Sequence, residues 1–263
     1  MKLTFHHINA FTDTLFKGNY AGVIFLDEWL STELMQAIAT ENNLSETAFV
    51  KQDGLNAYHI RWFSAITEID FCGHATLASA YLLFKQNPAL HELAFYAEAV
   101  GTLKALRKAD GFIAMTFPKQ MPEPLSEIPP ALLAGLSIAP SEVLINRQAY
   151  FAIYASEADI HGLKPKLEAL KTLAPYDVVV SAAGREYDFI SRYFWPASGG
   201  DEDPVTGSIH SGLAPFWASR LNKARLVAYQ ASQRGGTLHC QVEANSVIIS
   251  GQAVQYLEGE INI

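Results

Sequence analysis

The chain has few cysteines, no long hydrophobic run and no cluster of basic residues. Among its 263 residues only Cys72 and Cys240 are cysteines, too few and too far apart for a disulfide framework or a cysteine-based zinc site. No apolar run approaches the ~18 residues of a membrane-spanning helix. Residues 1–7 alternate in polarity like a strand and lack the pattern of a signal peptide. We therefore expect a cytoplasmic protein that does not enter a membrane.

The charge of the chain disfavours one class of partner. The formal net charge is −8, and no run of Lys or Arg offsets it locally. Such a surface repels the phosphates of DNA and RNA, so we expect no nucleic-acid partner. The composition, 49% apolar and 17% charged, is instead that of a folded chain with a packed core.

A proline-rich segment lies near the midpoint of the chain. Five prolines fall between positions 118 and 130. Proline removes an N–H donor and restricts the residue before it, so this segment is predicted to be a linker. We place one half at residues 1–118 and the other at 119–263. Alternating apolar runs bounded by glycine turns predict strands in both halves.

The two halves share an ordered pattern. Arg61-Trp62-Phe63 precedes an acidic connection and a helix start at Gly73, and Arg192-Tyr193-Phe194 precedes a longer acidic connection and Gly207. The shared order predicts an internal duplication. The alternative is two unrelated strand–turn–helix units.

Both predicted helices, near 74–85 and near 208–220, are apolar around most of their circumference. A helix of this kind must be enclosed, and a sheet curled around it would enclose it. The expected fold class is therefore α+β, with two pseudo-symmetric halves, each a mostly antiparallel β-barrel-like sheet wrapped around a central α-helix. Pro215 should kink the second helix or mark a late break.

The two helix starts are candidate anion sites. Glycine at positions 73 and 207 lets a ligand approach the backbone, whose N–H groups would bind a carboxylate. If both starts face one space, their dipoles would also stabilise an enolate-like intermediate. Ser208 is a candidate donor to the substrate carboxylate, or else a cap of the helix.

Three further residues are candidates for proton transfer. His74 lies at a helix start, where the dipole disfavours its cation, so we expect a neutral ring. Asp203 lies four residues before Gly207 and could act as a general acid or base. Glu46 leads an apolar strand into the core, where a carboxylate suits proton transfer. The alternatives are that His74 packs or caps the helix, that Asp203 caps the turn or helix, and that Glu46 is a solvated surface residue.

No common cofactor or metal motif is present. The sequence lacks G-x-G-x-x-G, G-x-x-x-x-G-K, H-E-x-x-H and G-x-S-x-G. His210 together with Asp203 and His74 could form a metal set, but no supporting residues accompany it. We expect neither a metal nor a cofactor.

Six segments of the chain match the motifs of one known family. They are Ala10-Phe11-Thr12, Phe16-Lys17-Gly18-Asn19-Tyr20-Ala21-Gly22-Val23, Asn43-Leu44-Ser45-Glu46-Thr47-Ala48-Phe49, Cys72-Gly73-His74-Ala75-Thr76-Leu77-Ala78, Asp203-Pro204-Val205-Thr206-Gly207-Ser208 and Arg234-Gly235-Gly236. With these segments the chain resembles the PhzF-like (phenazine-biosynthesis-like) isomerases of the diaminopimelate-epimerase fold, over nearly its whole length.

The resemblance implies a homodimeric, cofactor-free isomerase with its site between two β-barrel-like halves. It implies that Glu46 removes and returns the substrate proton, with His74 and Asp203 as hydrogen-bonding and proton-relay partners. Ser208 would contact the substrate carboxylate. The remaining expected substrate contacts are Gly73, Gly207, Asn19 and Thr206.

Two positions depart from related patterns. Tyr20 stands where the family commonly has proline, which alters the turn after Asn19. Amino-acid epimerases of the same fold use one cysteine from each half as bases, and here Cys72 matches the first but Thr206 occupies the second. A threonine hydroxyl is far too weakly acidic to replace a thiolate, so the two-thiol epimerase is disfavoured.

The expected substrate is a small carboxylate-bearing molecule, cyclic or unsaturated, whose identity the sequence does not define. Two alternatives stay open. One is a racemase that uses Cys72 as a base, and the other is a metabolite-binding protein without activity.

Overall fold

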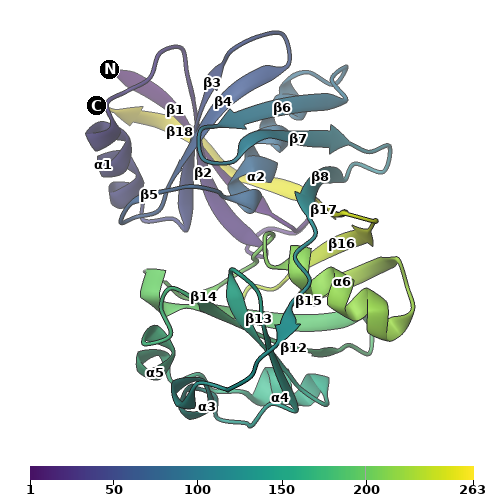
Figure 1. Ribbon diagram of the computed structural model, residues 1–263. Helices are drawn as coiled ribbons and strands as arrows, with labels where there is room; N and C mark the ends of the chain where they lie inside the picture. Colours follow the sequence, from purple (N-terminus) through teal and green to yellow (C-terminus); the bar gives the residue numbers. More distant parts are fainter. Residues whose placement is uncertain (199) are drawn as a thin grey trace. The chain divides into compact units, whose positions relative to one another are not determined.

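The computed structural model describes residues 1–198 and 200–263, which form two compact units (Figure 1). The first unit contains Met1–Thr116 and Ser250–Ile263, and the second contains Phe117–Ile249. The sequence analysis placed all of 119–263 in one half, so its assignment of the last segment was wrong. Ser250–Ile263 join the first unit because β18 (Ala253–Asn262) pairs antiparallel with β1 (Lys2–Ala10), from Lys2↔Asn262 to Ala10↔Ala253.

The first unit is a sheet with two helices. Its further strands are β2 (Asn19–Leu26), β3 (Glu46–Gln52), β4 (Ala57–Phe63), β5 (Glu68–Ile69), β6 (Glu92–Ala97), β7 (Gly101–Arg107) and β8 (Ile113–Pro118), and its helices are α1 (Thr32–Asn42) and α2 (Gly73–Gln86).

The second unit is built in the same style. Its strands are β9 (Glu123–Pro124), β10 (Glu142–Ile145), β11 (Ala149–Ile153), β12 (Asp177–Ala183), β13 (Phe189–Trp195), β14 (Gly200–Asp203), β15 (Arg225–Gln230), β16 (Gly236–Val242) and β17 (Ser246–Gly251). Its helices are α3 (Pro130–Gly135), α4 (Glu157–Gly162), α5 (Leu167–Lys171) and α6 (His210–Leu221), with a short 3₁₀ turn, η1, at Pro196–Ser198.

The two units share one order of strand pairing. In the first, β2–β3 is parallel, β3–β4 antiparallel, β4–β6 parallel and β6–β7 antiparallel. In the second, the same sequence of pairings runs through β11–β12, β12–β13, β13–β15 and β15–β16. The predicted α+β class with two pseudo-symmetric halves is confirmed, and the shared order is what an internal duplication produces.

An arginine–glutamate pair recurs at the same place in each unit. Arg61 on β4 donates from Nε and one terminal nitrogen to both oxygens of Glu68 on β5, at 2.7 and 2.6 Å. Arg192 on β13 does the same to Glu202 on β14, at 2.8 Å in both cases. Each pair ties a short strand to the strand before it.

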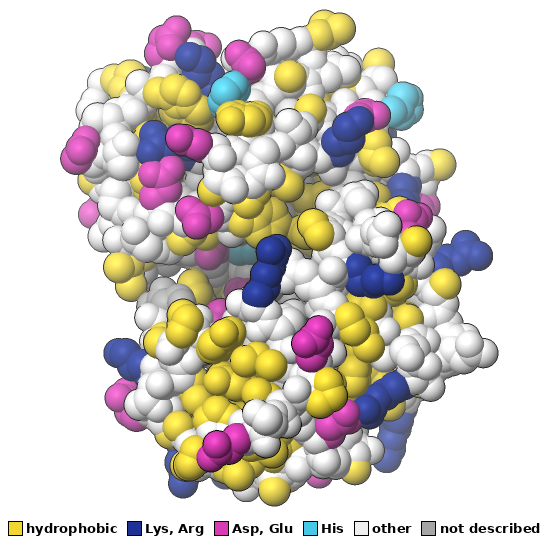
Figure 2. Space-filling view, viewed as in Figure 1, with side chains coloured by type: hydrophobic (Ala, Val, Ile, Leu, Met, Phe, Trp, Pro, Cys, Tyr) yellow, Lys and Arg dark blue, Asp and Glu magenta, His cyan; other side chains and the backbone are white. Residues whose placement is uncertain are grey.

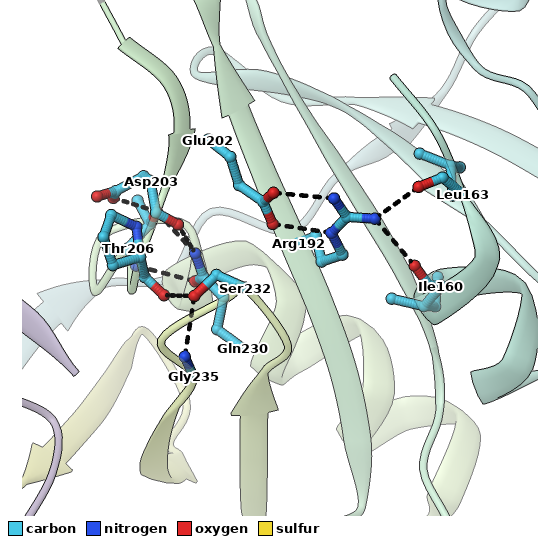
Figure 3. Close-up of polar contacts among 10 residues, drawn as sticks. Ile160, Leu163, Arg192, Glu202, Asp203, Thr206, Gln230, Ser232 and Gly235 are labelled. Carbon is cyan, nitrogen blue, oxygen red and sulfur yellow. Dashed lines mark hydrogen bonds and ion pairs between the residues drawn. The ribbon is translucent and has the colours of Figure 1, made fainter. Parts of the chain in front are cut away.

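The second pair is more deeply embedded than the first, and Figure 3 shows its contacts. The side chains of Arg192 and Glu202 are 13% and 23% exposed, against 29% and 37% for Arg61 and Glu68. Arg192 also donates to the backbone oxygens of Ile160 (3.2 Å) and Leu163 (2.7 Å), at the end of α4.

The central helices are enclosed, as their apolar circumference requires. Helix α2 packs against β1, β2 and β3, and α6 packs against β15 and β16. Helix α6 begins at His210 rather than 208, because residues 207–209 form a turn in which His210 N–H bonds to Gly207 O at 3.1 Å.

Pro215 does not break α6, which continues to Leu221. Proline has no N–H to donate to the carbonyl of Ser211, one turn earlier. The backbone N–H of Gln120 bonds to that carbonyl instead, at 3.0 Å. A neighbouring segment of the same unit thus satisfies the oxygen that proline frees.

The surface agrees with the composition. Figure 2 shows Lys and Arg side chains scattered over one face of the molecule, among acidic and uncharged ones. Among the described residues, no helix is both long enough and apolar enough to span a membrane.

The difference in burial between the two arginine pairs predicts a difference in stability. We expect Arg192→Met to lower the free energy of unfolding by about 2–4 kcal/mol, because it leaves Glu202 and two carbonyls without their donor. The matched change in the more exposed pair, Arg61→Met, should cost about 1 kcal/mol or less. Urea denaturation of both variants tests this, and equal losses would contradict it.

Candidate active site

Glu46 and His74 form a buried pair in the first unit. Glu46 is the first residue of β3 and His74 the second of α2, and they are 6% and 5% exposed. Glu46 Oε2 lies 2.9 Å from His74 Nε2, yet it makes no aligned hydrogen bond with the described residues. A buried carboxylate oxygen in this condition is unusual and remains available to accept a proton.

The other ring nitrogen of His74 faces Asn19 and Cys72. Asn19 Nδ2 lies 3.2 Å from Nδ1, and Cys72 Sγ lies 3.4 Å from it. The Asn19 amide can serve either form of the ring, donating through nitrogen to a neutral ring or accepting through oxygen from a protonated one. Gly18, at φ +68°, makes the turn that precedes Asn19; a Cβ there would lie 2.2 Å from Ala10 O.

The prediction of a neutral His74 was wrong. Burial disfavours the cation, but Cys72 and the Glu46 carboxylate outweigh burial and raise the pKa of His74 well above its ordinary value. The sequence argument considered only the dipole of the helix that carries His74. It could not include a carboxylate brought to the ring by β3.

Cys72 is a poor candidate for a base. Burial is the main reason that the pKa of its thiol is raised, and the Glu46 carboxylate adds to this against the lowering influence of His74. A cysteine base in a racemase acts as a thiolate, so the raised pKa of the Cys72 thiol disfavours that chemistry.

Three side chains of this cluster could hold a metal ion. Donor atoms of Glu46, Cys72 and His74 all lie within 4.8 Å of one another. A carboxylate, a thiolate and an imidazole are the donors that zinc accepts, with a fourth position left for water or substrate. The expectation of a metal-free site is therefore open to direct test.

In the second unit, Asp203 is held by two neighbours (Figure 3). The hydroxyl of Thr206 donates to Asp203 Oδ2. The amide of Gln230 donates to the backbone oxygen of Asp203 at 2.7 Å and accepts from the Thr206 N–H at 2.9 Å. Because the Thr206 hydroxyl is engaged in this way, its structural role is to position the carboxylate.

The Arg234-Gly235-Gly236 segment belongs to the same arrangement. Ser232 Oγ donates to Pro204 O at 2.7 Å and accepts from Gly235 N–H at 3.1 Å. Gly235 has φ +68°, and a Cβ on it would lie 2.0 Å from the hydroxyl of Tyr229. Only glycine fits this turn, which fastens the loop after Asp203.

Ser208 is tied to a different set of residues, which the sequence analysis did not identify. Gln148 Nε2 donates to Ser208 Oγ at 2.9 Å and to the hydroxyl of Tyr193 at 3.0 Å. Tyr193 in turn donates to Asp177 Oδ2 at 2.6 Å. No motif marks Gln148 or Asp177, and only the internal duplication could have pointed to them.

Asp177 and His210, in the second unit, have displaced pKa values. Burial raises the pKa of Asp177 to about 6, against the lowering effect of the Tyr193 hydrogen bond. Burial lowers the pKa of His210 to about 4, and its Nδ1 lies 2.8 Å from Thr206 O. A neutral His210 thus helps to hold the Thr206 turn.

The structure therefore brings the expected residues together in two sets. Asn19 and Glu46 each contact the ring of His74 in the first unit, next to Gly73. Asp203 and Thr206 contact one another in the second unit. Ser208, which follows Gly207, is instead hydrogen-bonded to Gln148.

Comparison with known proteins decides the family. A family model described as phenazine biosynthesis-like protein, PhzC-PhzF, matches residues 8–259. The chain belongs to this family. The resemblance read from the motifs is thus confirmed.

Relatives extend over the full chain. An uncharacterized isomerase of Pseudomonas aeruginosa is 45% identical over 264 residues, covering 100% of both chains. Another, from Halalkalibacterium halodurans, is 42% identical and covers 97% of this chain and 96% of its own. A PhzF-family crystal structure from Enterococcus faecalis is 41% identical, with a TM-score of 0.94 and full coverage of both chains. These comparisons support an isomerase.

A more distant likeness concerns the fold alone. A hydroxyproline epimerase from Agrobacterium vitis has a TM-score of 0.68 at 10% identity, covering 99% of this chain and 92% of its own. The fold therefore extends to epimerases, as the expected fold class implies.

The raised pKa of Asp177 predicts how stability changes with pH. Because its folded pKa of about 6 exceeds the unfolded value of about 3.9, its favourable contribution is complete below pH ~4 and is lost as the pH rises to about 6. Relative to the Asp177→Asn variant, the free energy of unfolding of the native protein should fall by about 2–3 kcal/mol across this pH interval.

Asp188 provides a control, because its contribution to stability should change with pH in the opposite direction. The free energy of unfolding of each protein is measured by denaturation at each pH. Burial would raise the pKa of Asp188, but Lys223 and the N–H of Val227 lower it. Compared with Asp188→Asn, the native chain should therefore gain stability as the pH rises. A profile for Asp177→Asn parallel to that of the native chain would contradict the assignment.

Proposed function

We propose that this protein is an isomerase that moves a proton on a small carboxylate-bearing metabolite, with Glu46 as the group that removes and returns it. The observation that carries the proposal is the state of Glu46. Its Oε2 is buried and without an aligned hydrogen bond, 2.9 Å from a ring whose pKa is raised. A carboxylate placed in this way can accept a proton from carbon.

His74 supports this step by its charge. Its Nε2 lies 2.9 Å from Glu46 Oε2, so the cation places a positive charge beside the carboxylate. When Glu46 takes the proton, the electron pair of the broken C–H bond moves into the conjugated system of the substrate and forms an enolate-like anion. Glu46 then returns the proton to a different carbon of that system, so substrate and product are isomers and no electrons are gained or lost.

The second unit is proposed to serve the same substrate. Asp203, oriented by Thr206 and Gln230, would exchange a proton with an oxygen or nitrogen of the substrate. Ser208 would donate to the substrate carboxylate, with the N–H groups that follow Gly73 and Gly207 as further anion contacts. A homodimer and a reaction that needs no cofactor complete the proposal.

The geometry does not support either alternative from the sequence analysis, the racemase with Cys72 as a base or the binding protein without activity. Burial raises the pKa of the Cys72 thiol, and the Thr206 hydroxyl already donates to Asp203. Neither group is therefore prepared to act as the base of a racemase. A binding protein without activity would have no use for a buried carboxylate oxygen that lacks an aligned hydrogen bond.

Replacement of Glu46 tests the proposal directly. We expect Glu46→Gln to slow the exchange of substrate C–H for deuterium by about 10³-fold or more, because the amide cannot accept the proton. Proton NMR in D₂O over a panel of cyclic and unsaturated carboxylates gives the measurement. The exposed Glu41→Gln on α1 is the control, and exchange at the native rate in Glu46→Gln would exclude this role.

Replacement of Cys72 separates the isomerase from the racemase and from a metal enzyme. Cys72→Ala should retain exchange within about fivefold, since the thiol does not carry the proton. Protein treated with a chelator, and shown by elemental analysis to be metal-free, should exchange at the native rate. A loss above about 10²-fold in a folded Cys72→Ala would favour a thiol base instead.

A further inference from the structure

The internal duplication gives Glu46 a counterpart in the second unit. Glu46 opens β3, which pairs in parallel with β2 through Ala21↔Glu46. Asp177 opens β12, the equivalent strand, which pairs in parallel with β11 through Ala149↔Asp177. The same strand position therefore carries a carboxylate in both units.

The partners of the two carboxylates also correspond. Cys72-Gly73-His74 at the start of α2 matches Thr206-Gly207-Ser208 before α6, so Ser208 takes the place of His74. Glu46 reaches His74 directly, at 2.9 Å. Aspartate and serine are both shorter, and the distance between them is bridged by other side chains.

The bridge consists of Tyr193 and Gln148. Tyr193 stands where the first unit has Trp62, and its hydroxyl lies between Asp177 and Gln148. The successive contacts from Asp177 to Tyr193, Gln148 and Ser208 measure 2.6, 3.0 and 2.9 Å. A continuous chain of hydrogen bonds thus connects the carboxylate with the serine.

The direction of this chain follows from the charge at its end. An ionised Asp177 only accepts, so the Tyr193 hydroxyl donates to it, and the Tyr193 oxygen must accept from Gln148. Gln148 therefore presents its NH₂ group, whose second hydrogen goes to Ser208 Oγ. The hydrogen of the Ser208 hydroxyl is then left for another acceptor.

We propose that ionised Asp177, acting through Tyr193 and Gln148, turns the Ser208 hydroxyl into a hydrogen-bond donor for the substrate carboxylate. A protonated Asp177 reverses the chain: it donates to Tyr193, Tyr193 donates to the oxygen of a rotated Gln148 amide, and that oxygen also takes the hydrogen of Ser208. Asp177 is thus a positioning residue, and its role rests on the proposed function of Ser208.

Two observations on Asp177 support this role. Its Oδ1 is buried and has no hydrogen bond to the described residues, so the ionised form is incompletely stabilised. Burial raises the pKa of Asp177 to about 6. The titratable group that faces Asp177 is Tyr193, and Asp203 acts on Tyr193 from β14. Burial raises the pKa of the Tyr193 hydroxyl well above its ordinary value, so Tyr193 stays neutral between about pH 5 and 7 while Asp177 responds.

A test without substrate follows the Gln148 side-chain amide by ¹⁵N–¹H NMR, with the signal assigned from its loss in Gln148→Met. The signal should move between about pH 5 and 7 with a midpoint near 6, since the amide rotates as Asp177 ionises. In Asp177→Asn it should stay constant over the same range. A native signal that does not move, or one that moves equally in Asp177→Asn, would overturn the proposal.

A second test uses KM for the carboxylate with the fastest exchange in the panel. The KM of the native protein should fall about tenfold between about pH 5 and 7, because one hydrogen bond to a charged group is gained. Any change of kcat with pH should be the same in the native protein and in Asp177→Asn. In Asp177→Asn, KM should no longer depend on pH. Tyr193→Phe should raise KM, whereas Tyr176→Phe should not, because Tyr176 is not part of the hydrogen-bonded series from Asp177 to Ser208. If no carboxylate exchanges at all, the proposed function fails, but the NMR test still decides the role of Asp177.

Discussion

A helix that is apolar on every side is stable in water only when it is enclosed, and this requirement shapes both units. The sheets around α2 and α6 provide the enclosure, and they carry the two helix starts into the interior as well. Polar groups at a buried helix start must then find partners within the protein. The pairs Glu46–His74 and Asp203–Thr206 are examples of such partners.

The two units meet this requirement in different ways. At α2 the Glu46 carboxylate and the His74 imidazole face each other, 2.9 Å apart. Near α6 the Thr206 hydroxyl donates to the Asp203 carboxylate, and the Gln230 amide bonds to the backbone of both residues. The duplicated fold thus has a carboxylate near each helix start, paired with an imidazole in one unit and with a hydroxyl in the other.

Much of the fold could be predicted from the sequence, because helix burial and the repeated Arg-aromatic-Phe pattern are local signals. The boundary of the second half could not, since the pairing of β18 with β1 joins opposite ends of the chain. The same limit applied to the site. Motifs identified Glu46, His74 and Asp203, but Gln230 lies 24 residues or more from its partners and leaves no local pattern. The charge of His74 was mispredicted for the same reason, because Glu46 reaches it from a distant strand.

The pairing of β18 with β1 also determines when each unit can be completed during synthesis. The second unit is one continuous segment, Phe117–Ile249, so all of its strands are available before the last residues leave the ribosome. The first unit needs Ser250–Ile263, which are made after the whole of the second unit. Proteins with several domains generally fold from the N-terminus onward during translation. Here that order is reversed: the N-terminal unit waits, with one edge of β1 unpaired, until β18 has been made, and that edge is where a nascent chain would be most open to wrong pairing.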